Sequence, residues 1–103
     1  MKSVVTDYDK CFFCGDTATE EHHLIFGTSG RAFSEKYGLK VGICPKCHTR
    51  SEYVTCRIHD NVKAEQLSKM LGQAIFEREM IKQGYTQDEA RQKMIAECGR
   101  SYL

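Results

Sequence analysis

The amino-acid sequence predicts an α+β fold, in which a metal-binding first half with two short strands precedes a helical second half. Two Cys-x-x-Cys pairs, Cys11/Cys14 and Cys44/Cys47, lie in the first half. Short apolar segments bounded by glycine lie between the pairs and are typical of strands. Beyond residue 60, apolar residues recur near the spacing of a helix. These three observations define the fold class.

Length and composition indicate one domain. The 103 residues are 41% hydrophobic and 28% charged, which is ordinary for a globular protein, and no low-complexity tract or linker divides them. We expect a single domain over residues 1–103, with a metal-binding core at 11–60 and a helical extension at 61–103. The start has no apolar signal core and no apolar run is long enough to span a bilayer, so we expect a cytoplasmic protein without a membrane partner.

The cysteines predict a structural zinc site. A two-residue turn between cysteines points both sulfurs at one ion, and two such pairs complete a closed tetrahedral site. In a reducing compartment, cysteines at this spacing are more often metal ligands than disulfides. We therefore expect one structural Zn²⁺ bound by Cys11, Cys14, Cys44 and Cys47. Cys56 and Cys98 belong to neither pair and are expected to be free and buried.

The first half contains two expected strands and two short helices. Residues 22–26 form a short apolar segment that ends at Gly27, and residues 39–43 alternate apolar with other residues up to Cys44. Between them, residues 32–37 can form one or two helical turns that stop at Gly38. A further helix after Cys47 would place His48 and Glu52 one turn apart on a common face.

Two longer helices are expected in the second half. The first runs from Val62 to Gln83, with Asp60 or Asn61 as its N-cap and Gly84 as its stop. The second begins after a capping box at residues 86–89, reaches Glu97 and ends at Gly99. We expect the apolar residues of both helices to face the core: Leu67, Met70, Leu71, Ala74, Ile75, Ile81, Ala90, Met94 and Ile95.

Histidines beside the cysteine pairs are candidates for a second metal site. His22 and His23 precede an apolar segment, and His48 follows Cys47 directly. They could instead complete the zinc shell or satisfy the core. The net charge of +1 does not favour a polyanionic partner. Residues 31–57, however, have a local excess of positive charge, which suits phosphate contacts or an ordinary solvated surface. The six basic residues and two acids are Arg31, Lys36, Lys40, Lys46, Arg50, Arg57, Glu35 and Glu52.

Four segments of the chain carry a family resemblance. They are residues 21–27 (EHHLIFG), 34–41 (SEKYGLKV), 44–48 (CPKCH) and 99–103 (GRSYL). Together they resemble small HNH proteins of bacteriophages and prophages, and the likeness covers most of the chain. It implies a treble-clef-like ββα-metal core with structural zinc, followed by two helices. It also implies a metal-dependent endonuclease that hydrolyses DNA phosphodiester bonds in phage DNA processing or recombination, in the host cytoplasm. Expected partners are DNA and phage or host recombination or packaging proteins.

The resemblance assigns roles to particular residues. His22 takes the position of a metal ligand, His23 that of the general base, and His48 that of a second ligand from the helix. A histidine exchanges protons near neutral pH, which suits a base. Glu52 stands where colicin-type relatives have a further histidine, but His59 is preferred as the third ligand because similar phage proteins have a histidine just before the long helix. The catalytic ion would be Mg²⁺, Mn²⁺, Ni²⁺ or Zn²⁺.

One motif residue is missing. The only asparagine is Asn61, well past the second cysteine pair, so the group that orients His23 stays open, with a backbone carbonyl as one candidate. Arg31 is the candidate phosphate clamp, unless it pairs with Glu35 or Glu21. The competing function is a non-catalytic zinc-knuckle module that binds nucleic acid or protein. A thiol oxidoreductase is disfavoured because no βαβ pattern surrounds Cys11 and Cys14.

Overall fold

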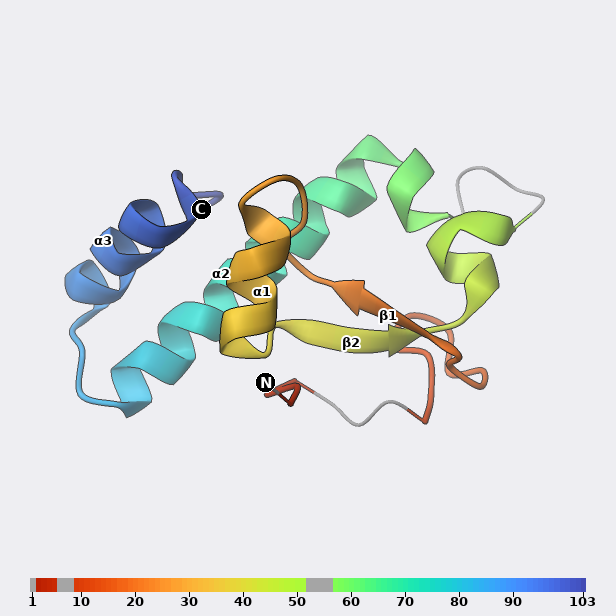
Figure 1. Ribbon diagram of the computed structural model, residues 1–103, viewed down its shortest axis with the longest axis horizontal. Coiled ribbons are helices and arrows are strands. Elements are labelled where there is room, and N and C mark those ends of the chain that lie inside the picture. The colour runs from red at the N-terminus through yellow and green to blue at the C-terminus, as the bar shows by residue number, and fades with distance from the viewer. Residues whose placement is uncertain (1, 6–8, 52–56) are drawn as a thin grey trace.

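The computed structural model describes residues 2–5, 9–51 and 57–103 and shows an α+β fold, as predicted. Figure 1 shows the two strands crossing the middle of the molecule, with the last helix at one end and the short helical turns that follow the second strand at the other. The shape is elongated, 42 × 25 × 18 Å. The elements are β1 Glu20–His23, α1 Gly30–Tyr37, β2 Lys40–Ile43, the π-helical turn η1 Lys46–Arg50, the 3₁₀ turn η3 Ile58–Asp60, α2 Val62–Lys82 and α3 Gln87–Cys98.

β1 and β2 form a two-stranded antiparallel sheet. His22 pairs with Val41 and His23 with Lys40. Because successive side chains of a strand point to opposite faces, the two histidines leave the sheet on different sides. His22 is buried and His23 is half-buried.

The first expected strand had the wrong bounds, since β1 begins at Glu20 and ends at His23. Leu24 and Ile25 leave the sheet and are fully buried. The Ser34 side chain satisfies the backbone of Ile25: Oγ accepts from Ile25 N–H (3.1 Å) and donates to Ile25 O (2.6 Å). Leu24 N–H still donates to Leu39 O, at 2.9 Å. α1 and β2 agree with the prediction within two residues, since α1 begins at Gly30 and β2 at Lys40. The helix expected after Cys47 is instead the π-helical turn η1, which begins at Lys46 and ends at Arg50, and Ser51 is extended. The turn therefore ends before residue 52, and Glu52 itself lies outside the described residues.

Caps define the two long helices as predicted. The Asn61 side chain accepts from Ala64 N–H at 3.2 Å and begins α2, which ends at Lys82, one residue early. Thr86 and Glu89 form the expected capping box of α3, and Gly99 ends it in a left-handed conformation. None of the described helices has the length and the apolar character needed to cross a bilayer.

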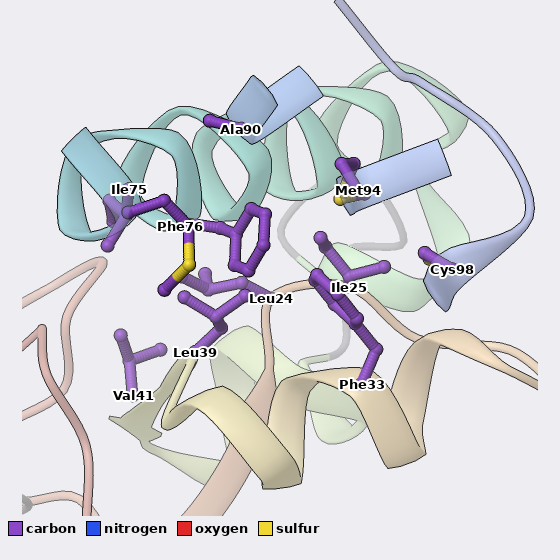
Figure 2. Packing of buried hydrophobic residues seen from close by; sticks show 11 residues of the cluster. Leu24, Ile25, Phe33, Leu39, Val41, Ile75, Phe76, Ala90, Met94 and Cys98 are labelled. Carbon is purple, nitrogen blue, oxygen red and sulfur yellow. The ribbon is translucent and has the colours of Figure 1, made fainter. Parts of the chain in front are cut away.

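The core lies between α1, α2, α3 and the segment after β1, as Figure 2 shows. The apolar face expected for α2 was partly wrong: Leu67 and Ile81 are 64% and 44% exposed. Polar side chains with partners are buried in their place, because a buried polar group is tolerated when it is hydrogen-bonded. Gln73 Oε1 accepts from Tyr102 N–H (2.6 Å), and Glu77 binds Arg91 Nε (2.6 Å). Met70, Ala74 and Ile95 are also exposed, whereas Leu71, Ile75, Ala90 and Met94 are buried or partly buried.

Candidate metal centres

The four cysteines of the two pairs lie together. Their sulfurs are all within 4.8 Å of one another. The Cys14 and Cys44 sulfurs are 3.5 Å apart, close to the edge of about 3.8 Å that a tetrahedral zinc site with bonds of about 2.3 Å requires. Phe12 N–H donates to Gly42 O at 2.9 Å and fastens the first loop to β2. This arrangement can hold a zinc ion.

Electrostatics within the cysteine cluster favour a bound cation. Burial raises the pKa of the Cys11 thiol, but backbone N–H groups of Cys44, Cys14 and Phe13 outweigh burial and lower it to about 7. Burial and the neighbouring thiols raise the pKa of Cys47 well above its ordinary value. Four thiols at this separation cannot all ionise without a positive charge between them, and a divalent metal supplies that charge. Cys98, by contrast, is free and buried as expected, and Cys56 lies outside the described residues.

Three histidines form a second cluster. His22 comes from β1, His48 from η1 and His59 from η3. One ring nitrogen of each lies within 4.8 Å of the others, and the Nε2 atoms of His48 and His59 are 3.0 Å apart. The structure thus brings together three residues that the sequence resemblance assigned to one metal. Glu52, the alternative third ligand, lies outside the described residues.

A hydrogen-bond chain assigns the tautomer of His22. Ser68 Oγ lies 2.7 Å from Leu24 O, a carbonyl that can only accept, so the serine hydrogen is directed there. The serine oxygen must then accept from His22 Nε2–H, which is 2.9 Å away. The free lone pair of His22 is therefore on Nδ1. Burial, followed by the nearby histidines His59, His48 and His23, lowers the pKa of His22 to about 3, so the ring is neutral, the form that binds a metal.

Carboxylates fix the other two rings. His48 Nδ1 is 2.9 Å from a Glu20 oxygen, and His59 Nδ1 is 3.4 Å from a Glu65 oxygen. When both rings are neutral, the form that binds a metal, each outer nitrogen is the donor and the lone pairs on the two Nε2 atoms face each other at 3.0 Å. Two acceptors repel at that distance, whereas a metal between them requires a nitrogen–nitrogen edge of about 3.3 Å. Outer partners of this kind are typical of histidine metal ligands.

His23 and Arg31 share a pocket with this cluster. The pocket has a volume of about 440 Å³ and is lined by Glu21, His22, His23, Phe26, Gly27, Arg31, His48 and His59. Arg31 is exposed and forms no ion pair within the described part of the chain, so the expected alternative of a pair with Glu21 or Glu35 is not seen there. His23 Nε2 instead contacts a Glu35 oxygen at 2.9 Å.

Sequence reasoning missed the outer partners. Glu20 precedes His22 by two residues and therefore lies on the same face of the strand, a signal available from the sequence. Glu65 and Ser68 are three residues apart on α2 and share a face, but nothing local indicates that this face meets β1. Phe26 packs its ring 4.7 Å from that of His59 and walls one side of the pocket.

Comparison of the chain with protein-family models, with curated proteins and with solved structures found no match. The chemistry of the site is therefore argued from geometry. A closed set of four sulfurs holds a metal without an open position, which suits a structural role. Three converging imidazoles leave a position open beside a fourth histidine and an arginine, which suits a reaction.

Proposed function

We propose that this protein is a metal-dependent HNH-type endonuclease that hydrolyses phosphodiester bonds in DNA. The observation that supports the proposal best is that three imidazoles converge in one pocket. His23 and Arg31 line the same pocket. In this proposal β1, β2 and η1 are the two strands and the helix of a ββα-metal motif. The resemblance in sequence adds a setting in phage DNA processing or recombination, within the host cytoplasm.

The ligand set narrows the choice of ion. Three neutral imidazoles suit Zn²⁺ and Ni²⁺ well and Mn²⁺ less well, whereas Mg²⁺ prefers oxygen ligands and keeps its waters. His22, His48 and His59 would hold the ion. When bound, the ion polarises a phosphate oxygen and neutralises negative charge that develops during hydrolysis.

The residues of the chain would perform the remaining steps. His23 takes a proton from the attacking water as the water oxygen bonds to phosphorus. The bond from phosphorus to the leaving sugar oxygen breaks, and that oxygen takes a proton from solvent. The planar guanidinium of Arg31 binds two phosphate oxygens and positions the substrate.

A plasmid-nicking assay tests the proposal. Wild type, His23→Ala and His48→Ala would be incubated with supercoiled plasmid and Zn²⁺, Ni²⁺, Mn²⁺, Mg²⁺ or chelator. Loss of a general base should lower the cleavage rate of His23→Ala by about 10² to 10⁴ while zinc content and DNA binding stay near wild type. His48→Ala should lose the second metal ion, measured by calorimetry, and keep the zinc of the cysteines.

Two outcomes would count against the proposal. Equal cleavage by wild type and His23→Ala would reject His23 as the base. A wild type that is inert on duplex, branched and single-stranded DNA with every metal would favour the non-catalytic zinc-knuckle module, which needs no open metal position.

A further inference from the structure

His23 belongs to a row of three side chains, in which Glu35 lies between His23 and Lys40. His23 and Lys40 are direct partners across the two strands. The Glu35 side chain, from α1, joins them: one carboxylate oxygen lies 2.9 Å from His23 Nε2 and the other 2.7 Å from Lys40 Nζ. The Lys40 side chain is only 8% exposed, so its ammonium needs acceptors, and the Glu35 carboxylate is closer to it than that of Glu21.

Glu35 can act only as an acceptor in this row. Hydrogen bonds from Lys40 and then His23 lower the pKa of Glu35 to about 2, against a smaller opposing effect of burial. An ionised carboxylate has no hydrogen to donate, so the hydrogen in the contact with His23 belongs to Nε2. The lone pair of the imidazole is consequently on Nδ1, the nitrogen that remains able to take a proton.

Glu21, His23 and Glu35 could also form a metal site, but the position of Lys40 disfavours it. Ligand atoms of Glu21, His23 and Glu35 lie within 4.8 Å of one another. Lys40 Nζ already provides the positive charge, at 2.7 Å from Glu35 and 3.7 Å from Glu21. A metal ion bound there would displace a buried ammonium group from its carboxylate, which is costly.

We propose that Glu35, held by Lys40, is the positioning residue of His23 and takes the role left open by the missing motif asparagine. It fixes the Nε2–H tautomer and the orientation of the ring, so that Nδ1 is the base. This inference rests on the proposed nuclease function, because it concerns how His23 performs that function.

The variant Glu35→Gln tests the inference because it keeps the shape of the side chain. The ammonium of Lys40 can only donate, so the amide oxygen faces Lys40 Nζ and the amide NH₂ faces His23 Nε2. His23 must then accept at Nε2 and carry its hydrogen on Nδ1, the wrong tautomer for a base. We expect kcat to fall by about 10² to 10⁴ with KM within about threefold of wild type. In ¹⁵N spectra of the imidazole, the hydrogen should move from Nε2 to Nδ1.

A matched control separates positioning from stability. Glu97 is another carboxylate whose pKa is about 2, because hydrogen bonds from Lys36, Tyr37 and Lys93 outweigh burial. It ties α1 to α3, away from the pocket. Glu97→Gln should lower stability and leave both kcat and the His23 tautomer unchanged.

The role of Glu35 and the nuclease function can fail separately. An active wild type with an equally active Glu35→Gln variant, or with an unchanged His23 tautomer in that variant, would overturn the role of Glu35 alone. A wild type that cleaves no DNA would overturn the proposed function, and the positioning role with it, whatever the tautomer.

Discussion

At the scale of single residues, hydrogen bonds outside the three-histidine cluster decide which nitrogens face inward. The resemblance in sequence pointed to His22 and His48 as ligands and favoured His59 over Glu52 as the third. It could not indicate Ser68, which lies 46 residues from His22 along the chain. Serine within a helix has no distinctive spacing, and its role depends on where α2 packs.

Ser68→Ala tests this outer hydrogen bond. The variant removes the acceptor of His22 Nε2–H, so the ring loses its fixed tautomer and orientation. We expect affinity for the second metal ion to fall by about 10- to 100-fold, while the zinc of the cysteines is retained. Calorimetric titration with Ni²⁺ measures the affinity, and elemental analysis measures the zinc.

Ser29→Ala is the matched control, because its hydroxyl donates to Cys98 O at 3.2 Å and belongs to a different part of the fold. The control should bind Ni²⁺ as wild type does. Unchanged affinity in Ser68→Ala would show that the tautomer of His22 does not depend on this serine.

At the scale of elements, the ends of the helices could be predicted and the buried face of α2 could not. Caps are local, so Asn61, Thr86 and Gly99 were sufficient to indicate where helices begin and end. The buried face depends on partners distant in sequence. Gln73 and Glu77 are buried because the C-terminal segment and α3 hydrogen-bond to them, whereas apolar Leu67 faces solvent.

Gly72 lets α2 approach the segment after β1 closely. A Cβ atom at this position would lie 2.8 Å from Ile25 Cγ1 and 3.0 Å from Leu24 Cβ. Alanine favours a helix by about 1 kcal/mol over glycine, but overpacking a core costs about 1–3 kcal/mol. We expect Gly72→Ala to lower the free energy of unfolding by about 1 kcal/mol, the middle of the range that these two effects leave, as measured by urea titration.

Ala74→Gly is the control, because Ala74 is exposed on the same helix and the change affects helix propensity alone. It should lower the free energy of unfolding by about 1 kcal/mol. A Gly72→Ala variant more stable than wild type would mean that the segment after β1 can move away from α2 without loss.

At the scale of the whole molecule, the buried apolar residues of the described ranges form two clusters. The larger joins α1, α2, α3, β2 and the segment after β1. The smaller contains, among the residues that the structure describes, Cys11, Ile43, Cys44 and Ile58, with Cys47 and Ala64 packed against it. So few apolar groups give little stability, and the smaller cluster depends on a metal bound by its cysteines.

Removal of the zinc should therefore unfold much of the protein. Binding of a structural zinc ion contributes on the order of 10 kcal/mol, which is comparable to the whole stability of a small domain. We expect strong chelator, or the variant Cys44→Ser, to abolish the cooperative thermal transition followed by circular dichroism. Two results would contradict this expectation. One is freshly purified protein that contains no zinc and still melts cooperatively, and the other is chelator-treated protein that melts as the untreated protein does.

Helix α2 belongs to both the larger core and the three-histidine cluster. It contributes Phe76 and Met80 to the core, and Glu65 and Ser68 as the outer partners of His59 and His22. The second metal site is therefore complete only when α2 has docked, whereas the cysteine pairs come from the loop before β1 and from the segment between β2 and the end of η1. A partly folded chain would bind zinc before it could bind the second ion. Under the proposed function, hydrolytic competence comes last in the order of assembly, so an unfinished chain cannot cut DNA.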